Sequence, residues 1–191
     1  MVRPCPRSLR GMQQADDHLK PIRLRPPTCD DAATLWQVAR DGGLDLNSPY
    51  AYLLLCRDFT ETCLVAEDAA GVVGFVTGYR PPRRPDVVFV WQVAVDPTAR
   101  RQGVAGTLVN GLVASAEQRG ARYLEATVTR SNQASQRLFE SVAAEWSAPL
   151  SERTLFDPDA FPGADHEAEI LYRIGPLLPA HARAPNVGAR A

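Results

Sequence analysis

The sequence predicts one α/β domain built on a mixed, mostly antiparallel sheet flanked by helices. Segments in which apolar and polar residues alternate, typical of strands, are separated by segments with the apolar spacing of amphipathic helices. A long apolar strand, residues 87–95, is followed by a loop rich in Arg and Gly and then by a helix with Val104, Leu108 and Leu112 on one face. The chain has 191 residues, 45% of them hydrophobic, which is enough for the core of one such domain.

The expected strands are runs with a two-residue period or runs rich in β-branched residues. Ile22–Arg25 alternates apolar and polar residues, as a half-buried strand does. The turn sequence at residues 68–71 predicts a hairpin between the second and third strands. In chain order, strands are expected at residues 22–25, 62–67, 72–79, 87–95, 123–129 and 167–174.

The expected helices begin at capping residues, and two of them stop at glycine. Thr28 and Asp31 have the spacing of a capping box. Ser48 supplies a cap before a first-turn proline, Pro49. The helices are expected from the capping box to Asp41, over 49–58, over 103–119 and over 132–144, with Gly42–Gly43 and Gly120 as stops.

Composition limits the cellular setting and the partners. Residues 1–20 and 179–191 are polar without periodicity, which predicts two disordered tails around a domain at 21–178. No apolar run reaches the length of a membrane span, and no signal-peptide pattern is present, so we expect a cytoplasmic protein. The net charge of −1 favours neither nucleic acid nor a membrane as partner. The cysteines form no CxxC pair and have no metal-ligand spacing with the histidines, so we expect neutral thiols and no metal: Cys5, Cys29, Cys56 and Cys63.

The loop at residues 100–106 is a candidate anion site. It lies directly between a strand and a helix, where backbone N–H groups of the first helical turn have no intrahelical partner. Gly103 and the small residues Ala105 and Gly106 allow an anion to approach the backbone, and Arg100 and Arg101 add positive charge. A plain strand–turn–helix with a basic surface loop remains the alternative.

Arg100-Arg101-Gln102-Gly103-Val104-Ala105 resembles the R/Q-x-x-G-x-G/A loop of the GNAT superfamily of acyl-CoA N-acyltransferases. The resemblance implies the GNAT fold, in which the strand before this loop splays from its parallel neighbour. It also implies that coenzyme A is bound, with its pyrophosphate on residues 100–106 and its pantetheine arm along the backbone of Val93, Ala94 and Val95. An amide near Val93 would face the thioester oxygen. A fully paired core strand fits the same side chains.

Asn132-Gln133-Ala134-Ser135-Gln136-Arg137-Leu138-Phe139 is similar to the N-x-x-A-x-x-L-Y helix that closes the site in this superfamily. The similarity implies that Asn132 lies near the cofactor arm, although a helix N-cap is an equally good role. Phe139 stands where a tyrosine acid is common, and Ser135 where Ala is usual. Because Phe cannot protonate a thiolate, the proton must come from the reacting ammonium, a water or another side chain.

Four separated blocks resemble the L-2,4-diaminobutyrate acetyltransferases of ectoine synthesis: residues 44–52, 78–82, 89–93 and 166–172. The resemblance implies transfer of the acetyl group of acetyl-CoA to the γ-amine of L-2,4-diaminobutyrate, giving N4-acetyl-L-2,4-diaminobutyrate for a compatible solute, by a homodimer. Acetyl-CoA is then a cosubstrate, and no metal takes part. A GNAT enzyme for another small diamine, such as ornithine or lysine, and a non-catalytic acyl-CoA-binding module are the alternatives.

A substrate with two ammonium groups needs negative charge in its site. We therefore expect Asp45 and Glu169 to hold the amines, Tyr50 to hydrogen-bond the substrate, and Trp91 to wall the site or face a cation. His166 is expected to make a polar contact or relay a proton. Glu169, directly or through water, is the expected general base, because deprotonating an amine of pKa about 10 at pH 7 costs about 4 kcal/mol.

Each of these residues also has a structural alternative. Asp45 fits a loop residue that caps local backbone, Trp91 fits a core residue, and Glu169 fits a solvated carboxylate. Strand alternation would put His166 and Glu169 on opposite faces. We therefore expect His166 to lie before the last strand or in a bulge.

Overall fold

The structure is a computed structural model that describes residues 21–162 and 166–178. The expected tails, residues 1–20 and 179–191, lie outside the described residues. Helices and strands follow the order β1 (Arg23–Arg25), α1 (Ala32–Gly42), α2 (Pro49–Asp58), β2 (Leu64–Asp68), β3 (Gly71–Tyr79), β4 (Val87–Val95), α3 (Val104–Gln118), β5 (Tyr123–Val128), α4 (Gln133–Glu145), β6 (Leu150–Phe156) and β7 (Glu169–Ile174). Short 3-10 turns occur at Cys29–Asp31, Thr60–Thr62, Pro97–Ala99 and Pro158–Ala160.

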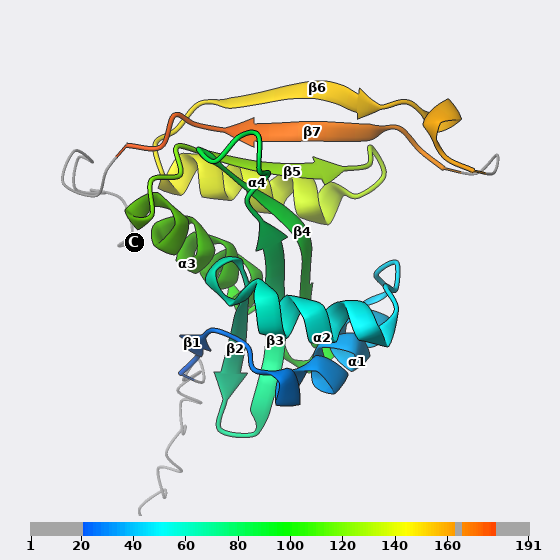
Figure 1. Ribbon diagram of the computed structural model, residues 1–191, viewed down its shortest axis with the longest axis vertical. Coiled ribbons are helices and arrows are strands. Elements are labelled where there is room, and N and C mark those ends of the chain that lie inside the picture. Colours follow the sequence, from blue (N-terminus) through cyan, green and yellow to red (C-terminus); the bar gives the residue numbers. More distant parts are fainter. Residues whose placement is uncertain (1–20, 163–165, 179–191) are drawn as a thin grey trace, which may run out of the picture.

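The strands form one seven-stranded sheet in the order β1-β2-β3-β4-β5-β7-β6. Only β4 and β5 are parallel, and all other neighbours are antiparallel. Helices α3 and α4 pack on one face of the sheet, and α1 and α2 cover β2, β3 and the end of β4 on the other (Figure 1). The predicted mixed, mostly antiparallel sheet flanked by helices is confirmed.

Local sequence signals fix the helix ends. Ser48 accepts a hydrogen bond from the Ala51 N–H at 3.3 Å, so the expected cap before Pro49 is present. Gly43 ends α1 with φ +76°, a left-handed conformation that favours glycine. The α1 and α2 residues then bury their apolar faces against Val65 and Phe75 of the sheet.

The parallel pair β4–β5 is short and opens in the middle of the sheet. Residues Val87 to Val90 pair with Tyr123 to Ala126, and the pairing stops there. Beyond this point β5 stays with β7, whereas the rest of β4 pairs with β3 alone. The expected splayed strand pair is therefore present, with a gap at the ends of both strands.

A β-bulge in β4 lies at the start of this gap. Thr77 of β3 is opposite Gln92 and Gly78 is opposite Val90, so Trp91 is the extra residue. A Cβ on Gly78 would collide with the Phe89 carbonyl oxygen, so the close approach of β3 and β4 beside the bulge requires glycine. The bulge exposes 49% of the Trp91 surface.

The sequence prediction missed β6 and was wrong in that respect. All of its residues are exposed except Leu150 and Leu155, which are half-buried, so no two-residue apolar period marks it. Backbone pairing to β7, from Leu150 opposite Ile174 to Phe156 opposite Glu169, makes it an edge strand. Such a strand depends on a partner distant in sequence rather than on its own side chains.

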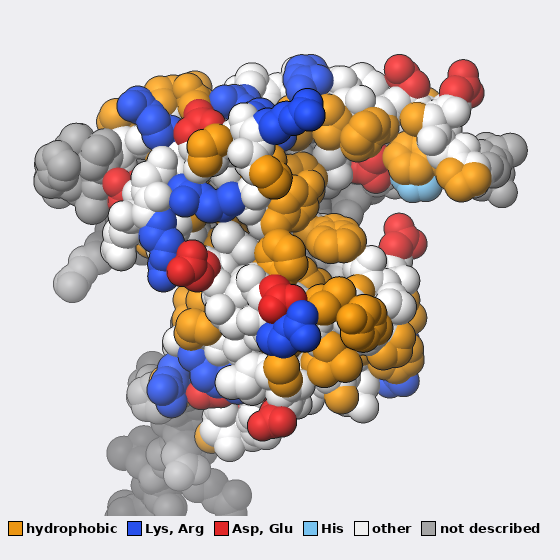
Figure 2. Space-filling view, viewed as in Figure 1, with side chains coloured by type: hydrophobic (Ala, Val, Ile, Leu, Met, Phe, Trp, Pro, Cys, Tyr) orange, Lys and Arg blue, Asp and Glu red, His pale blue; other side chains and the backbone are white. Residues whose placement is uncertain are grey.

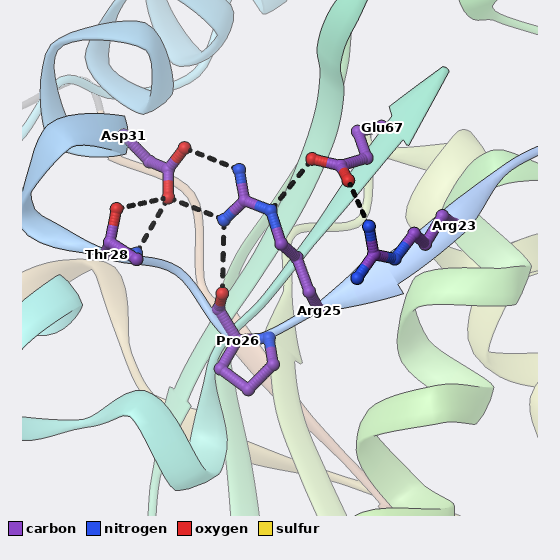
Figure 3. A network of polar contacts seen from close by, with 6 residues as sticks. All are labelled: Arg23, Arg25, Pro26, Thr28, Asp31 and Glu67. Atoms are coloured by element: carbon purple, nitrogen blue, oxygen red, sulfur yellow. Dashed lines mark hydrogen bonds and ion pairs between the residues drawn. The ribbon is translucent and has the colours of Figure 1, made fainter. Parts of the chain in front are cut away.

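A network of charged side chains fastens β1 to β2 and to the start of α1 (Figure 3). The Arg25 guanidinium donates to Glu67 Oε2 at 2.8 Å and to Asp31 Oδ2 at 2.7 Å. The Thr28 N–H also donates to Asp31 Oδ2, at 2.7 Å, as the capping box predicts. The hydrogen bonds from Arg25 lower the pKa of Asp31 to about 2. The Asp31 carboxylate is thus held in the charged form.

Candidate active site

The gap between β4 and β5 opens into a cleft of about 740 Å³. In Figure 2 the surface is hollowed between the β6–β7 hairpin and the helices α1 and α2, with acidic side chains on both sides of the hollow. The cleft is lined by the end of α1 and its loop, by β4, by the loop and first turn of α3, by the end of β5, by the first half of α4 and by the start of β7: residues 42–45, 90–95, 100, 105, 127–129, 132, 134, 135, 138, 139 and 169.

One end of the cleft meets the N-terminus of α3. The N-cap, Gly103, has φ +77° and no side chain over the N–H groups of the first turn. The first intrahelical bond runs from the Thr107 N–H to the Gly103 carbonyl at 3.0 Å. The N–H groups of Val104, Ala105 and Gly106 precede that bond and have no intrahelical acceptor. This helix end has the electropositive character that suits a phosphate group.

Arg100 connects this end of the cleft to two other elements. Its Nε donates to the Val95 carbonyl at 3.2 Å and its Nη2 donates to the Gly42 carbonyl at 3.2 Å. The side chain nevertheless stays exposed and lines the cleft. Arg101 and Gln102 are exposed next to it, and Arg101 has φ +62°. These residues give the loop its positive charge.

The backbone of β4 forms the floor of the cleft. Residues Trp91 to Val95 lie beyond the last pair with β5, so their edge toward β5 is open. Val93, Ala94 and Val95 all line the cleft. Asn132 lines it from the other side while its Oδ1 accepts the Ser135 N–H at 3.0 Å. The expected N-cap is thus compatible with a place at the cleft.

The opposite end of the cleft carries carboxylates. Asp45, in the loop between α1 and α2, and Glu169, the first residue of β7, both line it together with Trp91. Among the residues that the structure describes, neither carboxylate has a side-chain hydrogen bond or ion pair with the protein. The arrangement offers two anionic groups and an aromatic face to a cationic ligand.

Two predicted substrate residues lie outside the cleft lining. Tyr50 is 65% exposed on α2. His166 lies before β7, as strand alternation requires, and stacks on Phe161 with ring centroids 3.7 Å apart. Its Nδ1 is 2.8 Å from the Glu167 carbonyl oxygen.

The sequence analysis missed a buried polar pair next to the end of the cleft that carries the carboxylates. Gln92 Oε1 accepts a hydrogen bond from the Tyr52 hydroxyl at 3.0 Å, and Gln92 Nε2 donates to the Asp45 carbonyl at 2.8 Å. Tyr52 has no exposed surface, and its burial raises the pKa of the phenol. A glutamine inside an apolar strand next to Trp91 was the signal that could have identified the pair.

Phe139 lines the cleft at the position where a tyrosine acid was considered. Its ring packs on Tyr172 with centroids 6.3 Å apart, and Tyr172 does not line the cleft. Ser135, one turn earlier on α4, also lines the cleft and carries a hydroxyl group. The side chain at 139 therefore contributes no proton.

The three cysteines that the structure describes lie outside the cleft lining. Burial raises the pKa of Cys56 to about 12 and that of Cys63 to about 11, so both stay neutral. Cys29 is exposed, and Cys5 lies outside the described residues. In the described ranges no group of His, Cys, Asp and Glu is arranged to hold a metal ion. Likewise, no helix there is long and apolar enough to cross a membrane.

A splayed parallel strand pair over a bare helix N-terminus is the arrangement of the GNAT acetyltransferases. Residues 29–143 match the sequence model of the Acetyltransferase (GNAT) family, and the chain belongs to that family. Within it, the chain belongs to the L-2,4-diaminobutyric acid acetyltransferases. The enzyme of that name from Streptomyces coelicolor is 52% identical over 159 residues, covering 82% of this chain and 94% of the relative. That from Halalkalibacterium halodurans is 45% identical over 158 residues, 83% and 84% of the two chains.

Solved structures agree with this assignment. Diaminobutyrate acetyltransferase EctA from Paenibacillus lautus, in complex with its substrate L-2,4-diaminobutyric acid and coenzyme A, is 42% identical and superposes with a TM-score of 0.79. The match covers 84% of this chain and 98% of that one. The ribosomal-protein-S18-alanine N-acetyltransferase of Escherichia coli, 17% identical with a TM-score of 0.64, shares the fold.

Proposed function

We propose that this protein transfers the acetyl group of acetyl-CoA to the γ-amine of L-2,4-diaminobutyrate, giving N4-acetyl-L-2,4-diaminobutyrate for ectoine biosynthesis. The observation that carries the proposal is one cleft with an electropositive helix end at one side and two carboxylates at the other. This polarity suits an anionic thioester donor and a cationic acceptor. The names of the relatives, and the ligands of the P. lautus enzyme, support the same pair of substrates.

The residues at the helix end are proposed to bind the donor. The N–H groups at the start of α3 and the charges of Arg100 and Arg101 would hold the pyrophosphate, with Gln102 beside them. The open edge of β4 would pair with the pantetheine amides, and an amide near Val93 would stabilise the thioester oxygen. Asn132 would face the same arm. The proposed donor residues are Val93, Ala94, Val95, Arg100, Arg101, Gln102, Gly103, Val104, Ala105, Gly106 and Asn132.

The residues at the other end are proposed to bind the diamine. Asp45 and Glu169 would offset its two ammonium charges, and Trp91 would present its ring to one of them. Tyr50 and His166 lie outside the lining and would take part at its rim. Among these groups, Glu169 is the proposed general base. It accepts the proton of the γ-ammonium, directly or through a water, so that the neutral nitrogen attacks the carbonyl carbon.

The carbon–sulfur bond then breaks, and coenzyme A leaves as a thiolate that needs one proton. Phe139 lacks a proton to give, so the proposed source is the proton lost by the attacking nitrogen, carried by water. The nitrogen thus gives up two protons: the first goes to Glu169 and then to solvent, and the second, lost after the bond to the carbonyl carbon has formed, goes to the thiolate. Each turnover of the ammonium form therefore releases one proton. No metal takes part in this sequence.

We further propose that the domain spans residues 21–178, acts in the cytoplasm under osmotic stress, and is a homodimer. Large exposed apolar side chains on α2 and on its flanks support an interface: Leu46, Tyr50, Leu53 and Phe59. Light scattering on the purified protein tests the dimer. A mass near 20.9 kDa at micromolar concentration would contradict it.

Amine preference tests the function. The protein is incubated with acetyl-CoA and, separately, with L-2,4-diaminobutyrate, ornithine or lysine, and released thiol is measured. Diaminobutyrate is expected to give the highest kcat/KM, with acetylation at the γ-nitrogen in the product NMR spectrum. Faster turnover of ornithine or lysine would show that diaminobutyrate is not the preferred substrate. Binding of coenzyme A without release of thiol would show that the protein is a non-catalytic acyl-CoA-binding module.

A further inference from the structure

Gln92 lines the cleft near its carboxylates and connects three elements there, β4, α2 and the loop between α1 and α2. It follows the bulged Trp91 in β4 and is only 9% exposed. Its carboxamide contacts Tyr52 of α2 on one side and the backbone of Asp45 on the other. Residues 43–48, which join α1 to α2 and carry Asp45, are called the α1–α2 loop below.

The orientation of this carboxamide is fixed by chemistry. The Asp45 carbonyl only accepts hydrogen bonds, so the NH2 end of Gln92 must face it, 2.8 Å away. The oxygen end then faces Tyr52, whose hydroxyl donates to it at 3.0 Å. A turned carboxamide would place its oxygen against the Asp45 carbonyl oxygen, two acceptors with no proton between them, so this orientation is retained.

Two side chains, one from β4 and one from the loop before α3, hold backbone carbonyls within the α1–α2 loop and directly before it. Arg100 holds the Gly42 carbonyl just before it, and Gln92 holds the Asp45 carbonyl within it. The Asp45 side chain itself is exposed and lines the cleft. The position of the Asp45 side chain is therefore set through the Asp45 backbone, which Gln92 holds by its hydrogen bond to the carbonyl.

We propose that Gln92 is a positioning residue that determines the affinity for the amine substrate by fixing Asp45 over the cleft. The inference rests on the proposed function, because it takes a diamine as the ligand of Asp45. Gln92 has no place in the cofactor grip at α3, so its effect falls on the amine and spares coenzyme A. Tyr52 supports it from behind by holding the carboxamide in orientation.

Gln92→Met tests the proposal, because Met keeps the length and volume but makes neither hydrogen bond. We expect the KM for diaminobutyrate to rise about tenfold, equivalent to about 1.4 kcal/mol, a typical value for a lost hydrogen bond. The affinity for coenzyme A, measured by calorimetry, should stay within about twofold. Tyr52→Phe keeps the bond to Asp45 and should raise KM less, and it carries the test if Gln92→Met does not fold.

Thr77 supplies the matched control. It lies opposite Gln92 on β3, is fully buried, and its hydroxyl has no partner in the described part of the chain. Thr77→Val should therefore fold and leave unchanged both the KM for diaminobutyrate and the affinity for coenzyme A. A Gln92→Met variant with wild-type KM, or with an equal loss of coenzyme A affinity, overturns the proposal.

A double variant separates positioning from general damage. In an Asp45→Asn background, Gln92→Met should raise KM by less than about twofold, because both changes remove the same interaction. A full additional tenfold rise would mean that Gln92 acts independently of Asp45 and would reject the proposal. Absence of wild-type activity with diaminobutyrate would instead reject the proposed function, so the two failures are distinguishable.

Discussion

Replacing Gly103 by Asp is a direct test of the anion-binding end of the cleft. Gly103 caps α3 with φ +77°, and a Cβ there meets no atom within 4 Å, so a side chain has room. For a phosphate held by the first helical turn, we take a separation from the added carboxylate of about 5 Å. At an effective dielectric constant of about 20, each unit of like charge then costs about 3 kcal/mol. We expect coenzyme A to bind at least about a hundredfold more weakly.

Gly103→Asn is the control, because Asn has nearly the shape of Asp, also tolerates the left-handed conformation, and carries no charge. Its loss of affinity should be about tenfold or less. Calorimetric titration with coenzyme A at low and high salt measures both variants, and added salt should narrow the gap between them. Thermal unfolding checks that both remain folded. Wild-type affinity in the Asp variant, or equal affinities for Asp and Asn, would refute an electrostatic grip at this helix end.

Two further predictions concern carboxylates. Glu169→Gln should lower kcat about a hundredfold at neutral pH with little change in coenzyme A affinity, because it removes a base but keeps the shape; a wild-type rate in steady-state kinetics would exclude Glu169 as the base. Asp31 has a native pKa of about 2 beside Arg25, below its ordinary value of 3.8, so it stabilises the folded state above about pH 4 and stops doing so as the pH falls toward 2. Asp31→Asn should cost about 2 kcal/mol in urea unfolding at pH 7 and make this part of the acid dependence disappear. An unchanged acid profile in the variant would assign that dependence to other carboxylates.

The order of elements along the chain was predictable because its signals are local. The Thr28–Asp31 capping box, Ser48 before Pro49, and the apolar period of α3 each act within a few residues, and each is present in the structure. The strand β6 had no such signal. It forms because its backbone pairs with the free edge of β7. The side chains of β6 carry no sign of that pairing.

The kinds of side chain in the cleft were predictable from the sequence, but the exact set of lining residues was less so. Arg100, Trp91 and Glu169 were expected at the site, and all three line the cleft. His166 is the first residue of the block 166–172, yet it stacks on Phe161 and does not line the cleft. Sequence motifs identify the kinds of side chain a reaction needs, whereas the path of the chain decides which of them meet.

The sequence by itself determined the strand–loop–helix unit, the helix ends and the presence of acidic groups suited to a diamine, because these follow from neighbouring residues. Only the tertiary structure decided where β4 parts from β5, that Trp91 is the bulged residue, and that Gln92 reaches Tyr52 and Asp45, 40 and 47 residues away. Those features depend on strand register and on helices packed over the sheet. Contacts between distant residues come from the packing of the whole chain, which no local pattern encodes.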